Sequence, residues 1–305
     1  MVRGAAASAL AAAIVVPLVR RRLRIPPAVT TAAVASGPFA LAVLRPRSRA
    51  RDAALYALQM WGFVMAHELP YDDPESLRRR LKIRYPISSD RALGGGTLPN
   101  VLLQRALSPD GGVTAKDHAL TWVHWLWFFQ PHLALLWILA RDEERFPRAA
   151  RQMSATYDLG CLGYMAVPTA PPWWASEQGY TGDERVRRIM ADVGEEFWGR
   201  AWPALYDSLG GNPWAAMPSL HFATSLMSAL LLSESGRTSG AIGWTYAATL
   251  GFALVYLGEH YVTDLAAGAA LVAVVRRGEP LAEPLALGVS TLAQRLERIA
   301  NPDAR

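Results

Sequence analysis

Long apolar segments alternate along the chain with polar segments that carry most of the arginines. The two clearest apolar segments, 118–140 and 239–257, approach the roughly 20 residues that an α-helix needs to cross a bilayer. Shorter apolar segments cover residues 53–66, 153–167, 217–233 and 261–275. This pattern predicts an all-α fold, a polytopic membrane helix bundle with a six-helix core.

One or two extra helices are predicted before this core, over the Ala- and Val-rich segments 4–19 and 28–44. The first could instead be a signal peptide. However, the arginine run 20–22 follows it where a cleavage site needs small residues, which favours an uncleaved helix. The segment 1–50 is therefore either a spanning hairpin or a surface or re-entrant anchor, and the sequence leaves both open.

Short arginine-rich loops indicate the orientation of the bundle, because such loops tend to stay in the cytoplasm. The short segment 141–152 carries Arg141, Arg145, Arg148 and Arg151, which places it inside. The long polar segments 67–117 and 168–216 are then predicted to lie outside.

Composition agrees with a membrane protein and excludes several other classes. Hydrophobic residues make up 51% and charged residues 19%, which rules out intrinsic disorder. The single cysteine, Cys161, excludes a disulfide framework and a cysteine-based metal site. The net charge is +5, but the arginines flank apolar segments, which fits an anionic membrane surface better than a nucleic acid.

Three ionisable residues at the ends of apolar segments are candidates for chemistry. His260 and Asp264 are four residues apart, which on a helix places them on one face within reach of each other. The carboxylate would accept the proton of one imidazole nitrogen and leave the other free to attack. His221 is also predicted at an outer helix end, where it could serve as a general acid beside His260. The alternative is a pair of histidines that only cap helix ends.

The chain resembles the type 2 phosphatidic acid phosphatase superfamily in PSLH, at 218–221, and in HYVTD, at 260–264. The closer resemblance is to its inositol phosphorylceramide synthase (aureobasidin A target) branch. That likeness extends to MPSLHFA, YLGEHYVTDLAAG, VPTAPPWW at 167–174 and LPNVLLQR at 98–105. It covers roughly residues 53–275.

The resemblance implies a role for each matching residue. His260 would be the nucleophile that forms a phosphohistidine, Asp264 would orient it, and His221 would protonate the departing alkoxide. The implied substrate-binding positions are Ser219, Pro218, Tyr261, Pro171, Pro172 and Trp173. Ser219 would help to hold the phosphoryl oxygens. No metal or other cofactor is expected, since the histidine chemistry of this family is metal-independent.

The chain departs from the family's phosphatases at the cations that clamp phosphate. VPTAPPWW replaces their Lys…Arg-Pro motif, and Leu254 replaces an arginine six residues before the nucleophile. A phosphate monoester is close to a dianion and needs several cations, whereas a phosphodiester needs fewer. The departure therefore favours a phosphodiester donor. Other arginines could fold back and restore the clamp: Arg185, Arg187, Arg188, Arg200 and the cluster at 78–84.

A second departure lies before Pro131, where family members often carry a Ser-His pair. This chain has Leu126 and Trp127 there, and His124, one turn earlier, is a candidate substitute.

These observations predict an integral-membrane lipid phosphotransferase. It would move a phosphoryl head group, inositol phosphate from phosphatidylinositol, to a lipid hydroxyl through a phosphohistidine. The alternatives are a lipid phosphate or diphosphate phosphatase, with water as the acceptor, and a non-catalytic membrane binding protein. The expected partners are donor and acceptor lipids and not nucleic acid, while the sequence indicates no oligomeric state. The expected location is the cell membrane, with the active site on the extracytoplasmic face.

The predicted domains are an N-terminal membrane hairpin or anchor (1–50), a phosphatidic acid phosphatase-like catalytic membrane domain (51–278) and a C-terminal amphipathic tail (279–305).

Overall fold

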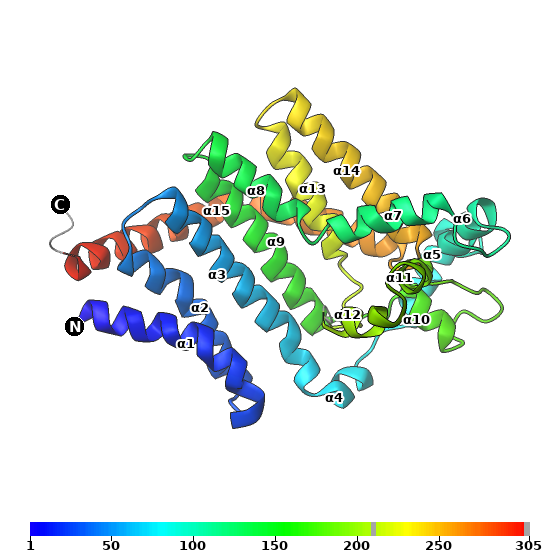
Figure 1. The fold of residues 1–305 in the computed structure, drawn as a ribbon, viewed down its shortest axis with the longest axis horizontal. Helices are drawn as coiled ribbons and strands as arrows, with labels where there is room; N and C mark the ends of the chain where they lie inside the picture. The colour runs from blue at the N-terminus through cyan, green and yellow to red at the C-terminus, as the bar shows by residue number, and fades with distance from the viewer. Residues whose placement is uncertain (209–211, 302–305) are drawn as a thin grey trace. The chain divides into compact units, whose positions relative to one another are not determined.

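The computed structural model describes residues 1–208 and 212–301, and Figure 1 labels its helices. The regular elements of this part of the chain are helices, which confirms the predicted all-α fold. The α-helices are α1 (Val2–Leu23), α2 (Pro27–Leu44), α3 (Arg49–Glu68), α4 (Pro74–Arg79), α5 (Arg84–Leu93), α6 (Pro99–Leu107), α7 (Ala115–Leu126), α8 (Gln130–Arg141), α9 (Phe146–Ala166), α10 (Pro172–Glu177), α11 (Ile189–Trp198), α12 (Trp202–Ser208), α13 (Leu220–Ser233), α14 (Arg237–Tyr256) and α15 (Val262–Ala300). Short 3-10 turns, η1 (Leu69–Asp72) and η2 (Gly199–Ala201), join some of them.

Two of the helices, α1 and α2, are each long and apolar enough to cross a membrane. Helices α7 and α8 meet the same criterion only as a pair, and the pair is bent by 54°. The prediction of one continuous helix over 118–140 is therefore wrong. Pro131 explains the break, because a proline has no N–H to donate and restricts the residue before it.

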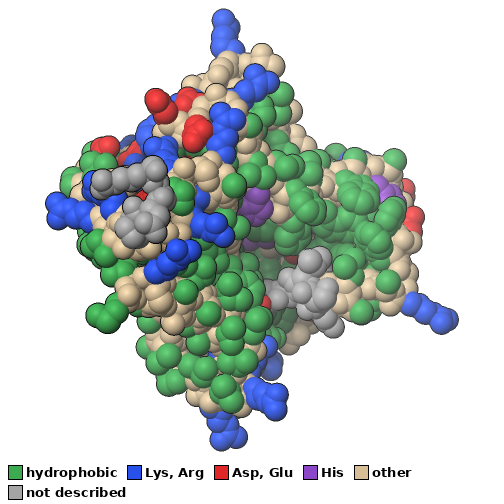
Figure 2. Space-filling view, turned by 60° about the vertical axis from the view of Figure 1, so that its left-hand side comes forward, with side chains coloured by type: hydrophobic (Ala, Val, Ile, Leu, Met, Phe, Trp, Pro, Cys, Tyr) green, Lys and Arg blue, Asp and Glu red, His purple; other side chains and the backbone are tan. Residues whose placement is uncertain are grey.

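Apolar side chains also cover much of the surface. Figure 2 shows hydrophobic side chains over broad areas of the face that it presents. Phe129 and Ile242 are 64% and 65% exposed, and both lie on or beside apolar helices. Contact with lipid would remove such side chains from water, which agrees with an integral membrane protein.

The chain forms two compact units. The first unit contains Met1–Asp72, Leu135–Ala155 and the part of α15 that begins at Val274. Within it, α1 and α2 form a hairpin whose turn contains Arg24 in the left-handed conformation (φ 51°). Arg20 is 5% exposed, and its guanidinium donates to Glu68 at 3.0 Å and to Asp72 at 3.1 Å, which ties α1 to the end of α3.

The second unit contains Asp73–Ala134 and Thr156–Ala273. Its helices α13 and α14 pack closely because small residues face each other: a Cβ atom on Gly243 would lie 2.8 Å from the Cα atom of Ala229. The segments 67–117 and 168–216, predicted as long loops, contain the short helices α4 to α6 and α10 to α12.

Helix α15 runs without a break through Pro280 and Pro284. The apolar segment 261–275 and most of the predicted C-terminal tail, 279–305, are therefore parts of one helix. The domain boundaries expected from the sequence stay a prediction.

Candidate active site

The segment with His221 begins helix α13 in the second unit. Ser219 is the N-cap: its Oγ atom accepts a hydrogen bond from the Phe222 N–H at 3.3 Å. Its own backbone N–H donates to the Asp264 carbonyl at 3.0 Å. Ser219 thereby joins the two predicted motifs through the backbone, and its side chain is fully buried. His221 follows two residues later, in the first turn of α13.

The second segment lies between α14 and α15. His260 precedes the first residue of α15, whereas Asp264 lies in its first turn. The Asp264 carboxylate accepts from the Tyr261 N–H at 2.9 Å and lies 3.2 Å from His260 Nδ1. Asp264 is fully buried and the His260 side chain is 5% exposed. A buried carboxylate at this distance fixes the His260 tautomer, with the proton on Nδ1.

The structure brings the two histidines into contact. His221 Nδ1 lies 3.2 Å from His260 Nε2. With the proton of His260 on Nδ1, its Nε2 atom is an acceptor, so the hydrogen-bond network assigns the donated proton to His221 Nδ1. A lone pair and a proton donor thus lie side by side, as a nucleophile and a general acid require. Which roles the two residues perform stays a prediction.

Rings from the end of α7 pack around His221. The Trp127 ring centroid lies 4.1 Å from that of His221, and the Trp127 indole N–H donates to Thr224 Oγ1 at 2.8 Å. The His124 ring centroid lies 4.9 Å from that of His221. His124 is 5% exposed, and neither of its nitrogens has a hydrogen-bond partner in the part of the chain that the structure describes. The break between α7 and α8 therefore places Trp127 directly on His221.

Two polar residues that sequence reasoning gave no role hold the backbone around His260. The Asp90 carboxylate, on α5, accepts from the Val262 N–H at 2.7 Å and from the Thr263 N–H at 3.0 Å. It therefore caps α15 from another helix. Asn100 Nδ2, on α6, donates to the His260 carbonyl at 3.0 Å and to the Val255 carbonyl at 2.8 Å. Asp90 and Asn100 are both fully buried.

Gln104 extends this support to the segment before α11. Its Nε2 atom donates to the Arg187 and Tyr256 carbonyls, each at 2.9 Å, and its Oε1 atom accepts from the Arg187 N–H at 2.9 Å. Gly258 lies against the same segment: a Cβ atom there would be 2.3 Å from the Arg187 oxygen, and its φ is +86°. Asn100 and Gln104 belong to LPNVLLQR, so this motif holds the backbone around His260.

The VPTAPPWW segment lies beside the histidine motifs. Thr169 forms isolated backbone bridges with Lys82 on one side and Ala215 on the other. Its hydroxyl lies 3.0 Å from the Tyr85 hydroxyl, whose proton is donated to Met217 Sδ at 2.9 Å. Burial raises the pKa of Tyr85; the hydrogen bond with Thr169 opposes this shift, and the charge of Asp264 adds to it. Tyr85 is therefore a protonated donor at neutral pH.

The predicted substrate-binding residues differ in accessibility. Pro171 and Pro172 are buried at the start of α10, whereas Trp173 and Pro218 are half-buried. The Tyr261 side chain is fully buried in an apolar cluster that includes Ile87 and Val186. Tyr261 therefore packs in the core, and contact of these residues with a substrate stays a prediction.

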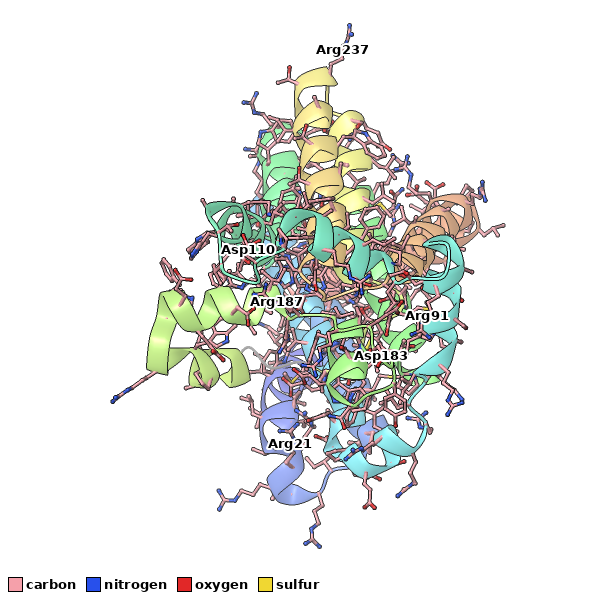
Figure 3. All side chains as sticks on the ribbon, turned by 90° about the vertical axis from the view of Figure 1, so that its right-hand side faces the viewer. Arg21, Arg91, Asp110, Asp183, Arg187 and Arg237 are labelled. Carbon is pink, nitrogen blue, oxygen red and sulfur yellow. The ribbon has the colours of Figure 1, made fainter. Side chains whose placement is uncertain are left out.

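One of the candidate replacement cations lies next to the loop that carries His260. Arg188 Nε donates to Glu259 Oε1 at 3.0 Å, and Glu259 directly precedes His260. Arg187, labelled in Figure 3, instead pairs with Asp192 at 2.7 Å. Arg185 and Arg200 are exposed at the surface.

Comparisons with known proteins agree with this arrangement. A family model of the PAP2 superfamily, the type 2 phosphatidic acid phosphatases, matches residues 112–276. A curated relative, the inositol phosphorylceramide synthase of Candida albicans, is 26% identical over 212 residues. The match covers 65% of this chain and 42% of the relative, so the chain spans less than half of that protein. No solved structure matches. The resemblance predicted from the motifs is confirmed.

Proposed function

The chain belongs to the PAP2 superfamily, and on that premise we propose that it is a lipid phosphotransferase with His260 as the nucleophile. The observation that carries the proposal is the chain of contacts Asp264–His260–His221, with 3.2 Å at each step. In such a chain the middle imidazole attacks through Nε2, the carboxylate stabilises the positive charge that develops on it, and the outer imidazole moves the proton.

The reaction has two displacements. His260 Nε2 attacks the phosphorus of a phosphodiester lipid, a P–N bond forms, and the P–O bond to the diacylglycerol breaks. Protonated His221 gives its Nδ1 proton to the departing alkoxide. In the second displacement His221 takes the proton from a lipid hydroxyl, whose oxygen attacks phosphorus while the P–N bond breaks. The covalent intermediate splits one difficult exchange into two easier ones.

The proposed donor is phosphatidylinositol, so the transferred group is inositol phosphate. Two observations support it. The Candida albicans relative is an inositol phosphorylceramide synthase. The chain also lacks the family phosphatases' arginine at Leu254, which suits a monoanionic phosphodiester. The acceptor is a lipid hydroxyl, since both substrates would reach the site from the bilayer.

The proposed location is the cell membrane, with the histidines at the extracytoplasmic face. The support is the arginine-rich short segment 141–152, which favours a cytoplasmic position for the opposite ends of the helices.

The test uses purified protein in mixed micelles with phosphatidylinositol, ceramide, diacylglycerol, phosphatidic acid and a polyprenyl diphosphate, with products followed by mass spectrometry. Wild type should form diacylglycerol and a new inositol-phosphorylated lipid. His260→Ala should form neither. His118→Ala is the matched control, because His118 pairs with Glu196 on the surface at 3.4 Å and should leave the products unchanged. Persistence of the products in His260→Ala would refute the proposal.

A second candidate is a lipid phosphatase, with water as the acceptor. Arg188 favours it, because an arginine beside the loop that carries His260 could help to compensate a phosphate dianion, although its ion pair with Glu259 offsets part of that charge. Release of inorganic phosphate from phosphatidic acid or the diphosphate, without head-group transfer, would identify this activity.

A further inference from the structure

Arg188 lies between an acidic and an aromatic side chain in the unit that carries the histidines. Its Nε atom donates to Glu259 Oε1 at 3.0 Å, and its guanidinium carbon lies 3.8 Å from the centroid of the Trp173 ring. The Arg188 and Glu259 side chains are only 15% and 11% exposed. Since water screens this pair little, it interacts more strongly than an ion pair on the surface.

Backbone hydrogen bonds attach both contacts of Arg188 to the loop that leads to His260. The Ile189 N–H donates to the Leu257 carbonyl at 3.1 Å, and the Trp173 N–H donates to the Gly258 carbonyl at 3.2 Å. Glu259 is the next residue of this loop. The cation, its acidic partner and the aromatic ring below it are therefore built onto the same few residues as the nucleophile.

The pair also lies close to the imidazole cluster in the chain. Glu259 directly precedes His260, whose Nε2 atom lies 3.2 Å from His221 Nδ1. The Glu259 carboxylate offsets part of the positive charge of Arg188. The site therefore offers less positive charge to a substrate than the clamp of several cations that the family's phosphatases carry.

We propose that Arg188 binds the phosphoryl group and that Glu259, by neutralising part of its charge, makes the site select a phosphodiester over a phosphate monoester. This inference deepens the proposed function and rests on it. A phosphodiester carries one negative charge, which a partly neutralised arginine can compensate. A phosphate monoester carries close to two negative charges. Arg188 would compensate only one of them, and the second would be repelled by the Glu259 carboxylate.

The test compares phosphatidylinositol with phosphatidic acid as substrates of the full-length protein in mixed micelles. Glu259→Gln keeps the shape of the side chain and removes its charge. It should raise phosphatidic acid hydrolysis relative to phosphatidylinositol turnover by at least about 10-fold, because the extra charge of the monoester no longer meets a carboxylate. Arg188→Gln should reduce both activities by about 100-fold. Arg188→Lys keeps the positive charge but loses the planar guanidinium, so both of its activities should lie between those of wild type and those of Arg188→Gln.

Glu184→Gln is the matched control. Glu184 pairs with Arg91 on α5 at 3.1 Å, so this change breaks an ion pair of the same kind in the same unit without touching Arg188 or Glu259 (Arg91 is labelled in Figure 3). It should leave the substrate ratio unchanged. Thermal unfolding of each variant separates loss of fold from loss of selectivity. If the ratio of phosphatidic acid hydrolysis to phosphatidylinositol turnover is the same in Glu259→Gln as in Glu184→Gln, the inference is overturned.

The His260→Ala variant distinguishes this failure from failure of the proposed function. If His260→Ala abolishes turnover but Glu259→Gln leaves the ratio unchanged, only the role of the Arg188–Glu259 pair is refuted. If turnover survives His260→Ala, the proposed function itself is refuted.

Discussion

Replacement of Asp90 should displace the start of α15, and with it His260 and Asp264, although Asp90 forms its hydrogen bonds with neither side chain. The Asp90 carboxylate accepts two backbone N–H groups at the start of α15, at 2.7 and 3.0 Å, and is fully buried. Hydrogen bonds to a charged group contribute about 1.5–3 kcal/mol each, and a buried N–H without a partner costs about 1–3 kcal/mol. Asp90→Asn keeps one acceptor and should cost about 1.5–3 kcal/mol. Asp90→Ala removes both and should cost about 3–5 kcal/mol, with a fall in Tm on the order of 10 °C.

The effect on activity follows from geometry. His260 and Asp264 lie at this same end of α15, and a displacement of about 1 Å at a reacting group can cost about 100-fold in rate. The assay combines thermal unfolding in detergent with lipid turnover. Asp90→Ala should lower kcat by about 100-fold, and Asp90→Asn by less.

Asp73→Ala provides the control for Asp90→Ala. Asp73 caps the short helix α4 through the Ser76 N–H at 3.0 Å and is exposed. Its loss should cost about 1 kcal/mol and leave kcat unchanged. If Asp90→Ala lowers Tm no more than Asp73→Ala and retains activity, the assignment of Asp90 as the residue that positions α15 is refuted.

Three further substitutions test other parts of the structure. His124→Phe should preserve or raise Tm, because it removes two buried nitrogens without partners among the described residues. If the His124 imidazole takes part in the reaction, the same variant should lower kcat. An unchanged kcat would show that His124 only packs against His221. Gly258→Ala should abolish activity and lower Tm, because the new Cβ atom would lie 2.3 Å from a backbone oxygen. Gly179→Ala is the control: Gly179 has φ +77° and nothing within 4 Å of an added Cβ atom, so the change should cost only about 1–2 kcal/mol of backbone strain. Equal losses of Tm in the two variants would refute the clash at Gly258. Burial alone would raise the pKa of Asp72, but hydrogen bonds from Arg20 and Arg21 hold that pKa below its usual value. The ionised Asp72 carboxylate therefore stabilises the folded protein above about pH 4, and this stabilisation is lost as the pH falls through the lowered pKa. Asp72→Asn should flatten the acid limb of a plot of Tm against pH, and an unchanged limb would contradict this.

The sequence predicted the chemical partners better than the local geometry that joins them. Spacing alone placed His260 within reach of Asp264, and their contact in the structure is 3.2 Å. The reason differs from the prediction, however, because His260 lies before α15 and not on it. A side chain just outside a helix can still reach the first turn, so the contact does not need the shared helical face that the spacing suggested.

The family resemblance singled out LPNVLLQR, which contains Asn100, but the roles of the supporting residues were not predictable because their partners are far away in the chain. Asp90 lies 172 residues before Val262, and Asn100 lies 160 residues before His260. An aspartate or asparagine in a polar helix gives no sign of such a partner, since the same residue types are common on exposed surfaces. The prediction for 118–140 was wrong for a different reason: hydropathy measures how apolar a segment is, whereas Pro131 decides whether the backbone can stay helical.

The motif residues alone also did not predict the net charge of the site. That charge matters for the choice between phosphatase and transferase, because the two substrates differ in charge. Leu254 indicated only that a familiar cation was absent. Whether another cation replaces it depends on how the segment before α11 folds, and whether that cation is effective depends on what neutralises it. Arg188 supplies a positive charge beside the loop that carries His260, and its ion pair with Glu259 at 3.0 Å offsets part of that charge. A motif-based choice between phosphatase and transferase therefore counts only part of the charge, and the pairing of loop residues has to be known before the substrate's charge can be inferred.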